Sequence, residues 1–428
     1  MMSAEQSEPP PSQTSRIGRS TLLLGAGLGV TGLGTLLTMA IGARALPSRE
    51  YGAFVTWWAL ATFCGTIFAV FEIYVARHVV TAVGEGRAFQ PSVATLSGSA
   101  WLVAAGTSGA LLVSSLWLAH HVFDGNIAAT LLLPVFVSLA MLQCLQRGVG
   151  IGRGTFGGNA SQGMTDGILR ALFAGLVALS GKHSMNWFAA AACASSACSL
   201  LVVHRVVPVW VRPRLSGTRV HWMPLMQLST GIISAMLLLN GSIVWLSASS
   251  SVSTYTLGAF AGAITLSQVP AQFASAVAST ALSNLSIAID SGKFDDFRRL
   301  RNKMLRWCAV GGGLFVAAFA LFGQLALSIY LGSNYQLPRV DLIVLGVTSM
   351  VMLLALVQQA ALSAQRQWRQ ISVSWGLGCL GFTATFFLPF EPLTRALLAP
   401  LLAALIVLVT MAVVQATENR KWSRETLG

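Results

Sequence analysis

Tyr51-Gly52-Ala53-Phe54 opens a long apolar segment that ends in the turn Glu85-Gly86-Arg87. The pattern returns 206 residues later: Leu257-Gly258-Ala259-Phe260 opens an apolar segment that ends in Ser291-Gly292-Lys293. Glycine, alanine and phenylalanine match identically at the start of both copies, and Ala82 matches Ala288 near their ends. The repeat predicts that one unit of roughly 200 residues is used twice, as is common in transporter folds.

The composition indicates a membrane protein. Of the 428 residues, 54% are hydrophobic and only 10% are charged, and the mean hydropathy is +0.69. An ordinary soluble domain has about 25% charged residues. Apolar segments of roughly 20 residues recur from Ser20 to Ala416, and each is long enough to cross the hydrocarbon core as a helix. We predict an all-α polytopic membrane protein with about 12 transmembrane helices.

The apolar segments divide evenly between two predicted lobes. They cover residues 20–42, 52–81, 93–119, 127–146, 160–181, 186–204, 223–247, 255–289, 305–331, 340–364, 370–390 and 394–416. The predicted domains are a disordered cytoplasmic tail (1–17), an N-lobe of six helices (18–204), a cytoplasmic linker (205–221), a C-lobe of six helices (222–417) and a cytoplasmic tail (418–428). Six crossings return the chain to the same side, so the lobes are parallel repeats related by a pseudo-two-fold axis along the membrane normal. Pro270 is expected to kink the long segment 255–289.

The basic residues predict the orientation. The net charge is +13, and most of the 27 Lys and Arg residues lie in loops that share one side of the predicted membrane. The exceptions are Arg44, Arg49, Lys182, Arg339 and Arg395 in loops of the other side, and Arg170 inside a helix. The positive-inside rule therefore places both termini in the cytoplasm. Because the positive charge lies in short loops, we expect no nucleic-acid partner.

No pattern of catalytic or cofactor-binding residues emerges. The sequence Gly27-Leu28-Gly29-Val30-Thr31-Gly32 matches a dinucleotide fingerprint, but it lies inside the first apolar segment. Together with Gly25, these glycines are better interpreted as small residues that let two helices approach closely. The chain has no P-loop, no Cys-x-x-Cys pair and no His-Glu-x-x-His spacing. We therefore expect a non-enzymatic protein without catalytic residues, metal or cofactor.

Arg170 is the strongest candidate for a functional residue. An arginine inside a transmembrane helix costs about 2.5–3.5 kcal/mol on insertion scales and requires a partner or a polar cavity. Asp166 lies four residues earlier, on the same helical face, and can pair with it. A spare guanidinium could bind an anionic headgroup, although a local ion pair near the inner surface is an equally simple interpretation.

Four further charged residues are candidates. Glu72 and Arg77 lie in the second half of the segment 52–81, where Glu72 is expected to be embedded and Arg77 to reach the inner surface. Arg147 and Arg153 flank a glycine-rich stretch, predicted as a loop that either contacts phosphate or serves as a flexible cytoplasmic turn. The charged segment 290–306 is interpreted as a basic cytoplasmic loop or as an amphipathic helix on the lipid surface.

Two motifs resemble a known family. The segment Gly42-Ala43-Arg44-Ala45-Leu46-Pro47-Ser48-Arg49-Glu50-Tyr51-Gly52 resembles the start of Wzx-type polysaccharide flippases of the multidrug/oligosaccharidyl-lipid/polysaccharide (MOP) exporter superfamily. The second motif is in the later copy, where the charged stretch from Gly292 to Arg301 is followed by Leu331-Gly332-Ser333-Asn334-Tyr335. The resemblance covers both halves in the same order.

The resemblance implies a function in polysaccharide biosynthesis. Such a flippase moves undecaprenyl-diphosphate-linked oligosaccharide from the cytoplasmic to the periplasmic face of the bacterial inner membrane, for O-antigen or exopolysaccharide, by alternating access. Expected partners are the lipid-linked substrate, membrane lipids, a polysaccharide polymerase and export components. The cationic side chains of Arg170 and Arg77 would be suited to bind the diphosphate. The alternatives are a cation-coupled small-molecule exporter of the MATE type and a membrane enzyme of the same pathway.

Overall fold

The computed structural model describes residues 13–123, 125–204, 214, 222–249, 252–270, 285, 288–289 and 291–425. All regular elements within these residues are helices. In chain order they are α1 (Gln13–Ala45), α2 (Ser48–Thr66), α3 (Ala69–Gly84), α4 (Gln90–Val113), α5 (Ser115–Val122), α6 (Ile127–Gly152), α7 (Phe156–Leu179), α8 (Met185–His204), α9 (Trp222–Ser247), α10 (Thr254–Ser267), α12 (Phe294–Leu331), α13 (Arg339–Ala364), α14 (Trp368–Thr385) and α15 (Pro392–Glu425).

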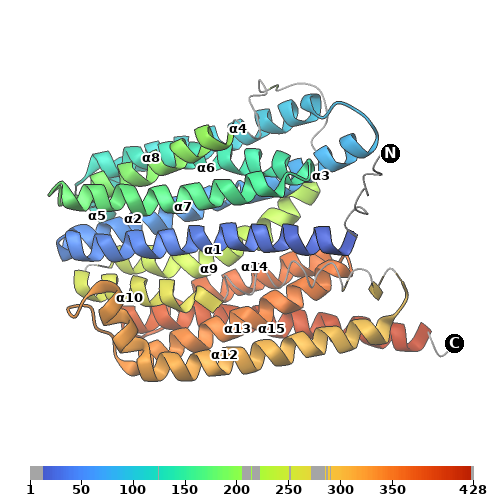
Figure 1. Ribbon diagram of the computed structural model, residues 1–428. Coiled ribbons are helices and arrows are strands. Elements are labelled where there is room, and N and C mark those ends of the chain that lie inside the picture. Colours follow the sequence, from blue (N-terminus) through green and yellow to red (C-terminus); the bar gives the residue numbers. More distant parts are fainter. Residues whose placement is uncertain are drawn as a thin grey trace, which may run out of the picture.

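The helices form two packed groups that follow the chain. In the first half, α7 packs against α1 and α8, and α6 packs against α3, α4 and α8. In the second half, α12 packs against α13, and α15 packs against α13 and α14. Figure 1 shows these groups on opposite sides of the molecule, and the contacts of α2 with α9 and α10 join them. The all-α, two-lobe architecture expected from the sequence is confirmed.

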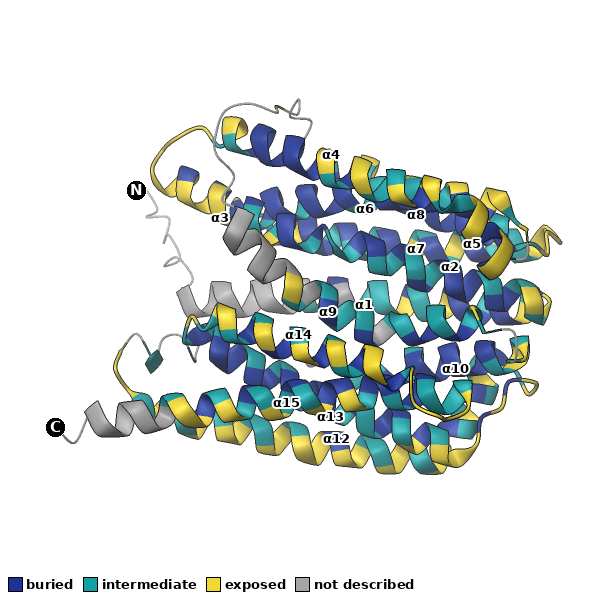
Figure 2. Cartoon of the chain, turned by 180° about the vertical axis from the view of Figure 1, so that it is seen from behind, coloured by how far each residue is buried: buried dark blue, intermediate teal, exposed yellow. Residues whose placement is uncertain are grey.

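The apolar helices make this a multi-pass membrane protein. Among the described residues, eight helical segments are long and apolar enough to cross a membrane, one of which combines α2 and α3. Large apolar side chains are exposed on the outer surface; on α12, Leu314, Leu321 and Leu325 are each more than half exposed. Figure 2 shows such exposed positions along the outer side of α12. This pattern fits contact with lipid tails, because water would penalise so much exposed apolar area.

The two copies of the repeat meet in space. Helices α2 and α10 begin at equivalent positions, Ser48 and Thr254. The Thr254 hydroxyl donates a hydrogen bond of 3.5 Å to the Ser48 hydroxyl across an offset of 206 residues. Beside them, a Cβ on Gly52 would lie 3.4 Å from Leu257, and a Cβ on Gly258 would lie 3.1 Å from Tyr51. Equivalent residues therefore face each other where the two lobes join.

Several predicted segments differ in detail, among them 93–119, which is divided between α4 and α5 at Ser114. The helix expected over 52–81 is interrupted at residues 67 and 68, where the Thr62 and Thr66 hydroxyls donate back to carbonyls of the preceding turn, a contact that bends helices. Helix α10 ends at Ser267, three residues before Pro270. Proline has no amide hydrogen to donate to the preceding helical turn, and its ring clashes with the carbonyl four residues earlier. Residues 271–284 of the predicted segment 255–289 lie outside the described residues. Of the two interpretations of residues 290–306, the loop is wrong from residue 294 onward, because α12 begins at Phe294.

The predicted domain limits are only partly described. Helix α1 begins at Gln13 and α15 continues to Glu425, so both predicted tails contain helical residues. Residues 1–12 lie outside the described residues, as does nearly all of the linker 205–221. In that linker, the amide of Arg214 donates to the carbonyl of Ala94 at 3.0 Å. The lobe boundaries and the cytoplasmic placement of the termini stay predictions.

Candidate functional site

Helix α7 carries a buried polar face into the N-terminal group of helices. Asn159, Gln162, Asp166 and Arg170 follow each other at spacings of three and four residues, so they share one side of the helix. Their exposures are 6%, 1%, 5% and 6%. The other side of α7 exposes Ile168, Leu172 and Leu176, each more than half exposed. The helix thus separates an apolar, lipid-facing side from a polar interior.

Glycines bring this face close to α1. A Cβ on Gly34 would lie 2.1 Å from the carbonyl oxygen of Gly167, and one on Gly27 would lie 2.9 Å from the Cα of Ala160. The helix-packing interpretation of the glycines in α1 is therefore correct for Gly27. It is wrong for Gly29 and Gly32, where an added Cβ would meet nothing within 4 Å among the described residues. The close approach places the threonines of α1 within hydrogen-bonding distance of α7.

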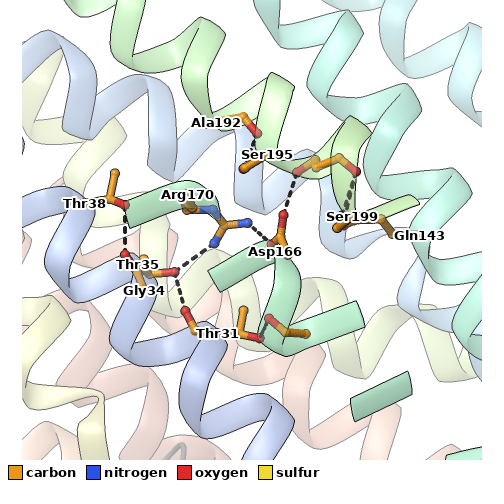
Figure 3. Close-up of polar contacts among 12 residues, drawn as sticks. Thr31, Gly34, Thr35, Thr38, Gln143, Asp166, Arg170, Ala192, Ser195 and Ser199 are labelled. Atoms are coloured by element: carbon orange, nitrogen blue, oxygen red, sulfur yellow. Dashed lines mark hydrogen bonds and ion pairs between the residues drawn. The ribbon is translucent and has the colours of Figure 1, made fainter. Parts of the chain in front are cut away.

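Arg170 and Asp166 form a buried ion pair, as their spacing predicts. Only 7% of each side chain is exposed. Arg170 Nη1 also donates to the Thr35 hydroxyl at 2.9 Å (Figure 3). The Ser196 hydroxyl donates to Asp166 Oδ1 at 3.2 Å. The guanidinium lies 4.8 Å from the ring centroid of Trp58, a cation–π contact with α2.

The arginine retains hydrogen-bonding capacity. Its Nε is buried without a hydrogen-bond partner among the described residues. Each guanidinium has five donors in a planar fork that matches phosphate as well as carboxylate. At 6% exposure, however, Arg170 touches a ligand only after a neighbour such as Trp58 moves. The pair is therefore buried in this conformation, with Trp58 of α2 against the guanidinium.

Glu72 and Arg147 form a second pair that links α3 to α6. Arg147 Nε donates to Glu72 Oε2 at 2.8 Å, and Nη2 donates to the sulfur of Cys144 at 3.1 Å. This pair is more open than the first, with 32% of the Arg147 side chain and 19% of the Glu72 side chain exposed. Both residues are sequence candidates, but their pairing across 75 positions was not predicted.

The glycine-rich stretch around Arg147 is not the predicted loop. Helix α6 continues through Gly152, so residues 147–152 are helical. A Cβ on Gly148 would lie 2.7 Å from the carbonyl oxygen of Glu72, and one on Gly152 would lie 2.5 Å from Val79. These glycines allow α3 to pack tightly against α6, and this contact places Glu72 beside Arg147.

Amides and hydroxyls connect the two pairs, and sequence reasoning missed them. Asn159 Nδ2 donates to the carbonyl of Arg147 at 3.0 Å, and Gln162 Nε2 donates to Gln146 at 3.2 Å. On the α8 side, Gln143 Nε2 donates to the Ser199 hydroxyl at 2.9 Å. The regular spacing along α7 is the signal that could have identified Asn159 and Gln162 as part of the site.

The structure leaves Arg77 and Arg153 outside this polar interior. Arg77 is exposed on α3. Arg153 is also exposed, caps the end of α6 and lies 5.8 Å from the ring centroid of Phe89. Among the described residues, no group of three or more His, Cys, Asp or Glu side chains could hold a metal ion. The candidate site therefore consists of the two arginine–carboxylate pairs, and the roles of Arg77 and Arg153 stay predictions.

Comparison with solved structures identifies the fold. An inward-facing multidrug resistance MATE family transporter of the MOP superfamily aligns over 92% of this chain and 95% of its own, with TM-score 0.71 and 11% identity. An outward-facing MATE family transporter of the same superfamily gives TM-score 0.63 at 14% identity, covering 96% of both chains. The eukaryotic MATE transporter AtDTX14 gives 0.69 at 11% identity, covering 96% of this chain and 99% of its own. No family model and no curated protein matches the sequence. The protein thus has the MATE transporter fold, as the predicted fold class requires.

Proposed function

We propose that this protein is a flippase that moves undecaprenyl-diphosphate-linked oligosaccharide across the bacterial inner membrane by alternating access. The observation that carries the proposal is the presence of two arginines, Arg147 and Arg170, inside the N-terminal group of helices. Both are paired, yet both retain donors for an anion. The resemblance of two sequence motifs to polysaccharide flippases suggests the substrate class, and the MATE fold supplies the two lobes.

A diphosphate headgroup needs cations along its path. Burying an unpaired phosphate in a low-dielectric interior is strongly unfavourable, and guanidinium groups are well suited to compensate it. Before substrate arrives, Glu72 and Asp166 keep the arginines neutralised, so the empty interior does not hold unpaired charge. Arg147, which is one-third exposed, is placed to meet the headgroup first, and Arg170 follows once Trp58 moves.

The contact between the two lobes supports alternating access. Tyr51 of α2 packs edge-on against Tyr335 with ring centroids 5.5 Å apart, and Tyr255 at the start of α10 packs 5.9 Å from Tyr335. Tyr51 is fully buried there. This end of the bundle is opposite the start of α1 and the end of α15 (Figure 1). The two lobes are therefore in contact at this end of the bundle, and alternating access requires this contact to open.

A cation-coupled exporter of the MATE type is the second candidate. The similar solved structures are themselves described as multidrug transporters. Such a transporter needs a carboxylate that exchanges its cation. Here Glu72 and Asp166 each contact an arginine, and α1 contains no acidic residue among its described positions. A coupling cation would have to displace a guanidinium, so we favour the flippase.

Deleting the gene separates the two functions. The flippase predicts that lipid-linked oligosaccharide accumulates on the cytoplasmic face and that surface polysaccharide falls, with unchanged drug susceptibility. The exporter predicts normal polysaccharide and increased sensitivity to cationic drugs. Complementation with the wild-type gene must restore the lost phenotype. A deletion strain in which no lipid-linked intermediate accumulates would exclude the flippase.

A further inference from the structure

The first turns of α12 carry a basic cluster that the proposed transport path does not use. A cavity of about 690 Å³ opens there. Its described lining residues all belong to α12, and all of them are exposed: Arg299, Asn302, Lys303, Arg306, Trp307 and Val310. The cavity lining therefore combines three cationic side chains with an aromatic ring and an aliphatic side chain.

The basic residues lie on the lipid-facing side of the helix. Lys303, Val310 and Leu321 are separated by multiples of roughly 3.6 residues, so they lie in one line along α12. Trp307 and Leu314 flank this line and are 69% and 68% exposed. The same face thus begins with positive charge and continues as exposed apolar surface.

Helix length places the cluster at the level of lipid headgroups. Helix α12 has 38 residues, so it is about 57 Å long, whereas the hydrocarbon core is about 30 Å thick. The apolar part from Trp307 to Leu331 spans about 36 Å and fills that core with a moderate tilt. Arg299, Lys303 and Arg306 then emerge beside the phosphates, and Trp307 lies at the boundary, where tryptophan is enriched.

Neighbouring charges leave the cluster positive. Asp295 pairs with Arg298 at 3.8 Å, and Arg301 donates to Asn302 at 2.9 Å on the flank of the cavity. Asp296, on the same face one turn before Arg299, is exposed and does not line the cavity. The described lining residues contribute three positive charges and no negative one.

We propose that this face of α12 binds the headgroup of an anionic phospholipid. Cations at the membrane surface attract anionic lipid with a strength that increases with each Lys or Arg. The cavity would receive the phosphate and glycerol, while the acyl chains lie along Val310, Leu314 and Leu321. The alignment of the cations with an exposed apolar stripe favours lipid over a soluble phosphate, because a soluble ligand has no use for that stripe.

Trp307 provides a local reporter for the test. Full-length protein is reconstituted in phosphatidylcholine vesicles that contain increasing fractions of brominated phosphatidylglycerol, which quenches nearby tryptophan. The signal of Trp307 is the difference between wild type and Trp307→Phe. We expect its quenching to saturate at a low fraction of brominated phosphatidylglycerol, and brominated phosphatidylcholine to quench only in proportion to its abundance.

Charge-matched variants make the result specific. Lys303→Gln/Arg306→Gln should raise the half-saturating fraction by about 30-fold. The control pair Arg87→Gln/Arg369→Gln removes the same charge from exposed positions elsewhere. It should leave the half-saturating fraction of brominated phosphatidylglycerol unchanged. Size-exclusion and circular dichroism profiles confirm that both variants are folded. An equal shift in both pairs, no preference for the anionic lipid, or displacement by millimolar glycerophosphate would overturn the proposal.

Discussion

Removing one partner of the Asp166–Arg170 pair should destabilise the protein far more than removing both. Arg170→Met leaves Asp166 at 5% exposure with only the Ser196 hydroxyl as a partner among its observed contacts. An acidic residue at the centre of a membrane helix costs about 2.5–3.5 kcal/mol, so the single variant should lose about 3 kcal/mol of unfolding free energy. Asp166→Leu leaves a buried guanidinium that still contacts Thr35 and Trp58, so its loss should be somewhat smaller.

The double variant Asp166→Leu/Arg170→Met should be close to wild type. It buries two apolar side chains in place of two charges, and such exchanges are often neutral. The coupling free energy between Asp166 and Arg170, taken from the double-mutant cycle of these variants, should therefore exceed about 2 kcal/mol. The wild type, the two single variants and the double variant are each purified and unfolded with SDS, and the loss of helix is monitored by circular dichroism. Arg77→Met on the exposed face of α3 serves as a control. Additive single losses, with coupling below about 0.5 kcal/mol, would refute the pairing.

Three further outcomes follow from other contacts. Gly34→Ala should cost about 1–3 kcal/mol because its Cβ meets the backbone of α7, whereas Gly29→Ala, with open space around it, should be neutral in the same SDS unfolding assay. A disulfide between Ser48→Cys and Thr254→Cys, whose native hydroxyls lie 3.5 Å apart, should stop transport when oxidised and restore it on reduction. Transport that continues with the disulfide formed would contradict the opening of this contact between the lobes. Arg147→Gln should reduce transport without the large loss of stability expected for Arg170→Met, because the Arg147 pair is partly exposed; equal losses of stability would argue against that difference.

Local patterns in the sequence predicted a large part of this architecture. The matched Gly-Ala-Phe segments predicted two equivalent helices, and α2 and α10 begin at equivalent residues and touch. The four-residue spacing of Asp166 and Arg170 predicted their ion pair, because one turn of helix fixes that distance. Both inferences depend only on contacts within one turn or on repetition along the chain.

Contacts between distant helices were beyond such reasoning. Glu72 and Arg147 pair only because Gly148 and Gly152 bring α3 against α6. A glycine-rich stretch is compatible with either a turn or a tight helix contact, and the facing helix decides between them. Thr35 and Trp58 likewise reach Arg170 from other helices, so the sequence predicted the charged residues of the site but not the polar contacts around them.

Transport of the lipid-linked substrate itself tests the central claim most directly. Purified protein is reconstituted in vesicles with an undecaprenyl-diphosphate-linked oligosaccharide, and exposure of the sugar to an external lectin is followed over time. We predict rapid exchange with the wild type and with Arg369→Gln. The folded Asp166→Leu/Arg170→Met variant should show only the slow rate of vesicles without protein. Exchange by that double variant at the wild-type rate would show that transport does not need Arg170. Absence of exchange by the wild type would contradict the flippase function.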